Sequence, residues 1–148
     1  MTPIEFRTRR KAFGLSQEEM GRCIALVSPM ADGSERPAVK QTTIARWEGG
    51  RGLPEWADME MYAIFGKLER VLAVMCDDIT QEARDAIEAT DANAIGVDAY
   101  GRDVDLWGTR PQWEGWPATL WNLAAMYAAD KLANELSVEV ELVEAAAA

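Results

Sequence analysis

Apolar positions near the start of the chain fall on helical spacings that predict two short helices. Thr2 and Glu5 form a capping-box pattern at the start of the first helix, and Gly14 is expected to end it in a left-handed cap. Ser16 with Glu19 repeats the capping-box pattern and starts the second helix. The inward side of the second helix is apolar and comprises Met20, Cys23 and Ile24.

A third short helix is predicted from about Gln41 to Glu48. Ile44 and Trp47 lie three positions apart and form its inward face. The pair Gly49-Gly50 is expected to stop this helix, and Pro54 to start the next element.

After Pro54 the apolar positions keep a helical period as far as about residue 75. Gly66 is expected to kink this stretch or to end one helix before another, and Thr80 to cap a further helix. The last helix is predicted to open at Pro117. Its inward face is expected to hold Leu120, Leu123, Ala124, Tyr127 and Leu132.

Alternating apolar and polar residues predict two short strands in the second half of the chain. The alternation is weak over residues 94–100 and clean over 137–143, and a turn-rich connector is expected over 101–117. The expected fold is mainly α: an N-terminal helix-turn-helix bundle, followed by a small helical region with short strands. Because a two-stranded sheet is too small to stand alone, the second region is predicted to mediate dimerisation.

The segments LSQEEM (15–20) and AVKQTTIARWEGGRGLP (38–54) occur in the order and vocabulary of a helix-turn-helix. The chain resembles the Xre/Cro-C1 family of repressors, whose usual string is close to LSQEELAxxLGVSxxTIxRWExGxxxP. The resemblance implies a DNA-binding region over residues 1–54, with the third helix in the major groove. Residues 55–148 then form a separate acidic, helical dimerisation region.

The outward face of the third helix carries side chains suited to base recognition. Gln binds adenine at two points, Arg binds guanine in the same way, and Thr offers a hydroxyl and a methyl group to thymine. The competing interpretation is a solvated amphipathic helix in a small bundle. The residues predicted to contact bases are Gln41, Thr42, Ala45 and Arg46.

A second set of residues suits contacts with the DNA backbone. Gln17 lies at the start of the second helix, where free amides and the helix dipole favour a phosphate. Lys40, Thr43 and Arg51 flank the third helix and are further candidates for phosphate contacts. The resemblance also implies an ion pair between Arg10 and Glu48 that ties the first helix to the third.

Residues 25–37 have no counterpart in the family string and are expected to form an inserted surface loop, either directly or after an extra turn of the second helix. Pro29, Asp32-Gly33-Ser34 and Pro37 are turn-forming and helix-breaking residues. Two roles stay open: the loop reaches a phosphate through Arg36, or it hinders docking in the groove.

Charge divides the chain at the same place as the motifs. Residues 1–54 hold nine Lys and Arg against six Asp and Glu, a net charge of +3, whereas residues 55–148 hold six against nineteen, a net charge of −13. A basic DNA-binding region joined to an acidic partner-binding region explains this asymmetry. The segments WPATLWNLAAMYAADKL (116–132) and VEVELV (138–143) give a tryptophan-bearing helix followed by a short closing strand. In this element order the C-terminal half resembles YdiL-like and anti-CRISPR-associated regulators, in which this part mediates dimerisation.

Several other functions are disfavoured by the composition. The chain has no histidine, and its two cysteines, Cys23 and Cys76, lie singly in helical patterns, so we expect no metal, no cofactor and no enzymatic activity. No apolar run reaches membrane length, no signal-peptide pattern opens the chain, and we expect a cytoplasmic protein.

The sequence therefore predicts a DNA-binding transcriptional regulator, a homodimeric repressor that binds an inverted repeat in double-stranded DNA. The alternative is an antitoxin or phage accessory protein that mainly binds a protein partner, through its acidic half. Four tryptophans within residues 107–121 also leave a small-ligand pocket as an alternative to their use in a core or interface.

Overall fold

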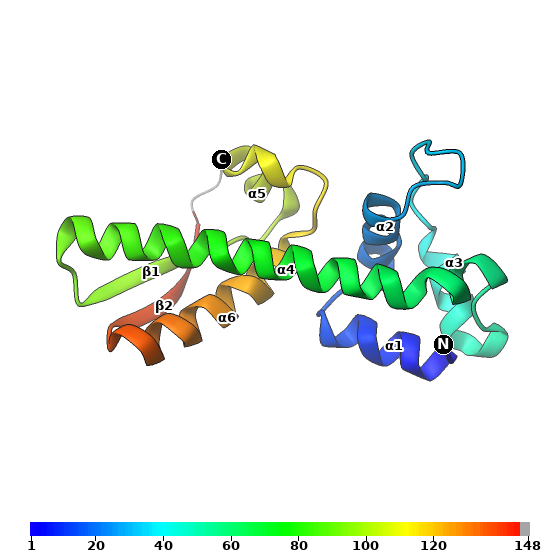
Figure 1. The fold of residues 1–148 in the computed structure, drawn as a ribbon, viewed down its shortest axis with the longest axis horizontal. Coiled ribbons are helices and arrows are strands. Elements are labelled where there is room, and N and C mark those ends of the chain that lie inside the picture. Colours follow the sequence, from blue (N-terminus) through cyan, green and yellow to red (C-terminus); the bar gives the residue numbers. More distant parts are fainter. Residues whose placement is uncertain (146–148) are drawn as a thin grey trace. The chain divides into compact units, whose positions relative to one another are not determined.

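The computed structural model describes residues 1–145 and is mainly helical, with one small sheet (Figure 1). The elements follow one another in the order α1 (Pro3–Ala12), α2 (Gln17–Val27), α3 (Gln41–Arg46), α4 (Glu55–Thr90), β1 (Ala94–Ala99), α5 (Asp103–Thr109), α6 (Ala118–Leu136) and β2 (Glu139–Glu144). A π-helical turn, Trp47–Arg51, follows α3, and a 3-10 turn, Pro111–Trp113, follows α5. The mainly α fold class with a short β element agrees with the prediction.

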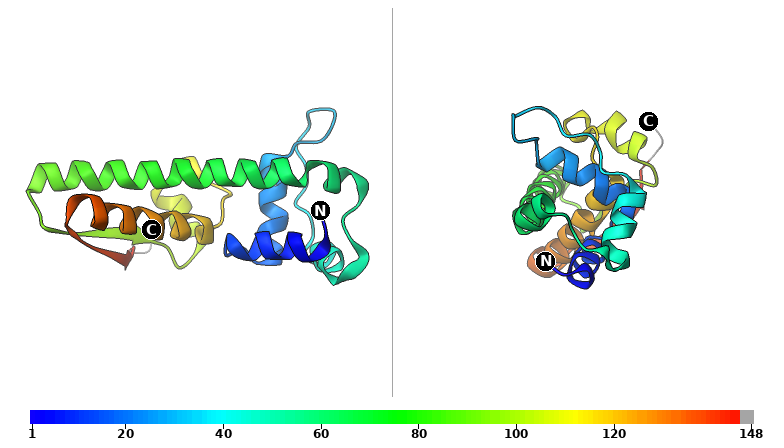
Figure 2. Two further views of the ribbon diagram at one scale, coloured as in Figure 1. Left: turned by 60° about the horizontal axis from the view of Figure 1, so that its bottom comes forward. Right: turned by 90° about the vertical axis from the view of Figure 1, so that its right-hand side faces the viewer.

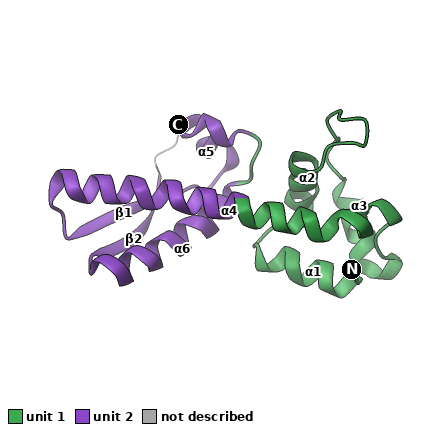
Figure 3. Ribbon diagram, viewed as in Figure 1, with its two compact units in different colours: residues 1–70, 115–117 green, residues 71–114, 118–148 purple. Residues whose placement is uncertain are grey.

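The chain divides into two compact units (Figure 3). Unit 1 comprises residues 1–70 with 115–117, and unit 2 comprises residues 71–114 and those from 118 onward. The border falls inside α4, beyond the position after residue 54 that the sequence predicted. The reason is packing within unit 1: the ring of Phe65 lies 5.9 Å from the rings of both Phe6 and Phe13.

Local capping explains where the first two helices begin. The Thr2 hydroxyl accepts the Glu5 amide at 3.2 Å, and Ser16 and Glu19 form a complete capping box with bonds of 3.1 and 3.0 Å. The helix α2 continues to Val27, so the inserted segment without regular structure runs from 28 to 40. The first residues of the predicted insertion, 25–27, thus extend α2 by the extra helical residues that the sequence left open, and residues 38–40 continue the irregular segment beyond the predicted end. In Figures 1 and 2 this segment projects away from the helices of unit 1.

The helix α4 is continuous for 36 residues, which contradicts the predicted break near Gly66 and the predicted cap at Thr80. The Thr80 hydroxyl bonds to the Cys76 carbonyl at 2.8 Å, as a threonine inside a helix does. A row of buried residues from Met61 to Ala83 continues through both positions. Burial of this row along α4 outweighs the local preferences of one glycine and one threonine.

Unit 2 contains both strands, close to the predicted ranges. β1 and β2 are parallel, with Ala94 opposite Glu139 and Ala99 opposite Glu144. A parallel pair needs a long connection, which α5 and α6 supply. The expected connector over 101–117 therefore contains a helix, α5.

The helix α6 packs against both strands with an alanine-rich face. Leu120, Ala124 and Leu132 are buried as predicted, whereas Tyr127 is 47% exposed and Leu123 is half-buried. The predicted inward face was therefore partly wrong. The buried face of α6 also includes the small residues Ala125, Ala128 and Ala129, which the prediction did not name.

Candidate nucleic-acid interface

The short helix α3 is held to unit 1 by two large apolar side chains. Ile44 is fully buried and Trp47 is 4% exposed. The Trp47 ring makes edge contacts at 5.9 Å with Phe6 of α1 and with Trp56 of α4. Gly50 follows with a φ of 103°, a left-handed conformation that favours glycine and ends the helical turn. The inward face agrees with the sequence prediction.

The structure places the four predicted base-contact residues on the side of α3 that faces away from this core. Gln41, Thr42 and Arg46 are exposed, and Ala45 is half-buried. The Arg46 side chain makes no hydrogen bond or ion pair with any residue between 1 and 145. One row of side chains with donors, acceptors and a charge is thus open to a ligand.

A chain of side-chain contacts connects this row to the interior of unit 1. The Arg10 guanidinium donates to both carboxylate oxygens of Glu48, at 2.6 and 3.0 Å. Glu48 also accepts the Gln17 amide at 3.0 Å, and the Gln17 oxygen accepts the Gln41 amide at 2.7 Å. The expected Arg10–Glu48 ion pair is present, and its side chains are only 9% and 6% exposed. Gln41 is therefore oriented by an anchored network.

The Glu48 carboxyl remains ionised inside this network. Burial alone raises the pKa of Glu48, but the hydrogen bonds from Arg10 and Gln17 and the charge of Arg10 together lower it below the ordinary value. Arg10 further donates to the Leu15 carbonyl at 2.6 Å, so its guanidinium also holds the turn between α1 and α2. Removing either charge would strand the other in a buried place.

The candidates for backbone contacts differ in their availability. Lys40, at the N-cap of α3, and Arg51 are exposed, and their side chains have no hydrogen-bonding or charged partner among residues 1–145. Thr43 is half-buried. Gln17 is half-buried and its side chain is already bonded to Glu48 and Gln41, so its backbone amide at the start of α2 is the group available to a phosphate.

The inserted segment 28–40 is anchored at one arginine. Arg36 donates to the Ser28 carbonyl at 2.8 Å, and its guanidinium lies 4.1 Å from the centre of the Trp56 ring. The Arg36 guanidinium therefore contacts other residues of unit 1 and does not extend outward toward a phosphate. The tip is closed by its own bonds, among them Ser34 to the Asp32 carboxylate. Of the two roles left open for the segment, the structure leaves the phosphate contact through Arg36 without a free guanidinium.

Sequence reasoning missed a close approach between α2 and the end of this segment. The Val39 amide donates to the Gly21 carbonyl at 3.1 Å, and a Cβ on Gly21 would lie 1.8 Å from the Val39 carbonyl oxygen. Because Val39 immediately precedes the N-cap of α3, Gly21 sets where α3 begins. The available signal was a glycine inside a helix, where it costs roughly 1 kcal/mol relative to alanine.

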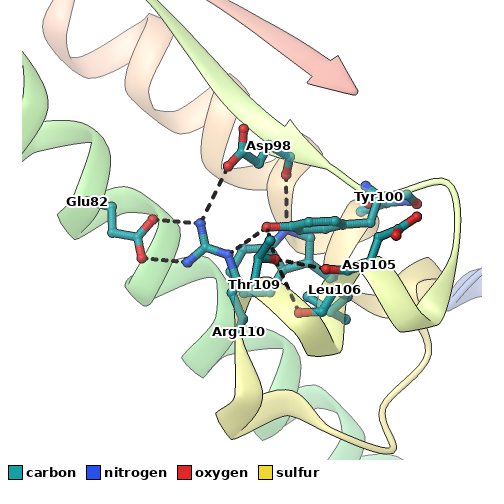
Figure 4. A network of polar contacts seen from close by, with 9 residues as sticks. Glu82, Asp98, Tyr100, Asp105, Leu106, Thr109 and Arg110 are labelled. Carbon is teal, nitrogen blue, oxygen red and sulfur yellow. Dashed lines mark hydrogen bonds and ion pairs between the residues drawn. The ribbon is translucent and has the colours of Figure 1, made fainter. Parts of the chain in front are cut away.

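Unit 2 has its own polar cluster, which the sequence also did not reveal (Figure 4). Arg110, after α5, bonds to both oxygens of Glu82 on α4 at 2.5 and 2.8 Å, and to the Tyr100 hydroxyl at 3.1 Å. Its guanidinium also lies 4.4 Å from the centre of the Trp121 ring. The hydrogen bonds to Glu82 raise the pKa of Arg110 above its ordinary value, so this arginine stays charged.

The tryptophans of residues 107–121 contribute mostly to packing. Trp121 and Trp113 are buried, while Trp107 and Trp116 are half-buried. No helix within residues 1–145 is both long and apolar enough to cross a membrane. No known family model matches the chain, and a search of curated proteins finds no significant match.

Proposed function

We propose that the protein is a sequence-specific DNA-binding regulator of transcription, with α3 as its recognition helix. The observation that carries the proposal is the exposed row Gln41, Thr42 and Arg46 on a helix whose opposite face is buried. The bond from Gln41 to Gln17 supports it, because preorganised side chains lose less entropy on binding. The resemblance of residues 15–20 and 38–54 to the Xre/Cro-C1 family gives the same function.

Base contacts can be tested on the best duplex recovered from a random-sequence pool. Gln41→Ala and Arg46→Ala should each lose about 1–3 kcal/mol of discrimination between that duplex and one with a changed base pair. Lys11→Ala, which removes an exposed side chain from α1, is the matched control. If both α3 variants stay folded and discriminate as well as the parent, α3 does not contact bases.

Backbone contacts have a different signature. Lys40→Ala and Arg51→Ala should weaken binding to every sequence alike and reduce the salt slope by about one phosphate each. Lys131→Ala, which removes an exposed cation from unit 2, should leave the slope unchanged. Equal slopes for all three variants and the parent would exclude Lys40 and Arg51 as phosphate contacts.

The favoured form of the regulator is a homodimeric repressor at an inverted repeat, because one α3 meets few base pairs and two can bind half-sites ~10 base pairs apart. Exposed apolar residues of unit 2, among them Met126, Tyr127 and Leu142, support a dimer interface there. Leu123→Asp or Leu142→Asp should give a monomer in light scattering, with weaker binding to the repeat. A parent that is monomeric at tens of micromolar would exclude this assembly.

The net charge of unit 2 favours a second candidate function, the binding of another protein. This unit holds four Lys and Arg against fifteen Asp and Glu, a net charge of −11. An antitoxin or phage accessory protein would use such a surface for its partner and the DNA-binding unit for autoregulation. Co-purification of a basic partner through unit 2 would favour this alternative.

A further inference from the structure

The outer edge of β1 in unit 2 is only partly occupied. The carbonyls of Asn93 and Ala99 accept hydrogen bonds from the β2 side, so the odd-numbered residues of β1 direct their backbone groups toward β2. The even-numbered residues direct theirs to the opposite edge. Side chains of α6 cover the end of that edge: Trp121 donates to the Asp98 carbonyl at 3.0 Å, and Asn122 bonds to both the amide and the carbonyl of Tyr100 at 2.8 Å.

In the N-terminal part of β1 the backbone groups on this same edge are unpaired. The amides and carbonyls of Ala94 and Gly96 have no hydrogen-bond partner among residues 1–145. An unpaired strand edge is a template for another extended segment. Because α6 covers the edge at Asp98 and Tyr100, an added strand can pair with β1 only at Ala94 and Gly96.

A cavity of about 200 Å³ lies along this open stretch. Gly96 and Asp98 of β1 line one side, and Ile79, Ala83 and Ala86 of α4 line the other, with Trp121 and Arg110 also in contact with it. Figure 4 shows the polar end of this site, where Glu82 of α4 and Asp98 of β1 both point toward Arg110. The cavity thus combines an unpaired backbone, an apolar wall and charged groups.

The charge of this site favours a cation. Arg110 is engaged by Glu82 and Tyr100, whereas within residues 1–145 the Asp98 carboxylate has only one charged contact, with Arg110 at 3.8 Å. Asp98 is therefore an acceptor with spare capacity, in a unit of net charge −11. A second copy of β1 is a poor occupant, because that strand is already paired with β2 and packed against α6.

We propose that the outer edge of β1 is a docking groove for an extended, positively charged segment of a partner protein. The partner's main chain pairs with Ala94 and Gly96, and a lysine or arginine side chain approaches Asp98. The apolar wall from α4 accepts a small aliphatic side chain on the neighbouring position. This function is separate from DNA binding through α3.

A short synthetic peptide tests the groove in the full-length protein. The probe is acetyl-TVKVT-amide, and its controls are the same peptide with glutamate in place of lysine, and an N-methylated version that cannot pair with a strand edge. In ¹⁵N-labelled protein, the lysine peptide should shift the amide signals of Gly96 and Asp98. Losing about two backbone hydrogen bonds should make the N-methylated peptide roughly tenfold weaker.

Matched variants distinguish peptide binding in this groove from peptide binding elsewhere on the protein. Ala86→Trp fills the cavity and should abolish the shifts, whereas Ala89→Trp, on the same helix but outside the cavity lining, should preserve them. Asp98→Asn should remove the preference for lysine over glutamate. Equal binding of the N-methylated peptide, equal shifts from lysine amide alone, or shifts of Gly96 that grow with protein concentration without peptide would each overturn the proposal.

Discussion

In each unit an arginine pairs with a glutamate far away in the sequence, and the pairs Arg10–Glu48 of unit 1 and Arg110–Glu82 of unit 2 differ in burial. In unit 1, Arg10 and Glu48 are 9% and 6% exposed, and Glu48 continues through Gln17 to Gln41 on α3. In unit 2, Arg110 is 14% exposed and Glu82 is 56% exposed. Arg110 keeps Tyr100 and the Trp121 ring as further partners.

The difference shows how the same chemical pair serves two purposes. A buried pair fixes the geometry of the elements that carry it, because each charge depends on the other to offset its burial. An ion pair with an exposed carboxylate contributes little to the free energy of unfolding, since water can replace the partner. We infer that the pair in unit 1 positions the candidate recognition helix, and that the pair in unit 2 leaves acidic surface accessible.

The largest contrast is expected from removing each glutamate. Glu48→Ala should lower the free energy of unfolding of unit 1 by about 3–5 kcal/mol, because Arg10 is left buried and unpaired. Glu82→Ala should lower that of unit 2 by only about 0–1 kcal/mol. Urea unfolding followed by amide signals of each unit measures both. Similar losses in the two units would remove the distinction between the pairs.

A smaller effect is expected from Gly21→Ala in α2. The added Cβ would lie 1.8 Å from the Val39 carbonyl oxygen, so the start of α3 must move, and we expect a loss of about 1–3 kcal/mol together with weaker DNA binding. Gly49→Ala is the control, because within residues 1–145 no atom beyond its chain neighbours and its own helical turn lies within 4 Å of the added Cβ, and it should change stability by less than about 1 kcal/mol. A neutral Gly21→Ala would show that the Val39 segment is free to shift.

Acid should weaken unit 1 through Glu48. The folded-state pKa of Glu48 lies below the ordinary value of 4.5, so its contribution is fully present above pH 4.5 and is lost as the pH falls through the lower folded pKa. The stability difference between the parent and Glu48→Gln should therefore shrink below pH 4.5. Chemical denaturation at a series of pH values measures it. A difference that stays constant down to pH 3, well below the ordinary glutamate range, would contradict the depressed pKa.

The smallest expected effect, and one of opposite sign, concerns α4. Gly66 lies inside a continuous helix, and an added Cβ would meet only Arg70, at 3.9 Å. Gly66→Ala should therefore stabilise the protein by about 0.5–1 kcal/mol. Thermal unfolding of parent and variant is the measurement. A loss of stability would show that the helix is interrupted at residue 66.

Features that depend on neighbouring residues were predictable from the sequence. The capping box of Ser16 and Glu19 and the inward pair Ile44 and Trp47 were both expected. Each needs only a spacing of three positions, which a sequence shows directly. The outward row of α3 follows from the same periodicity.

Features that depend on distant residues were not predictable. Local signals at Gly66 and Thr80 indicated a break in α4, but burial along the helix overrides them. The close approach of Gly21 to Val39 and the pairing of Arg110 with Glu82 depend on how the chain folds back on itself. The parallel direction of β1 and β2 likewise follows from the path through α5 and α6, which alternation alone does not encode.

The most direct test of DNA binding through α3 is a titration of ¹⁵N-labelled protein with a duplex at low salt, followed by amide shifts. We predict that shifts concentrate on residues 40–46 and Arg51 of unit 1, and that signals of β1 and α6 in unit 2 stay in place. At low salt even a non-specific duplex should bind through its phosphates. Shifts confined to unit 2, or no shifts in α3 at saturating duplex, would contradict the proposed recognition helix.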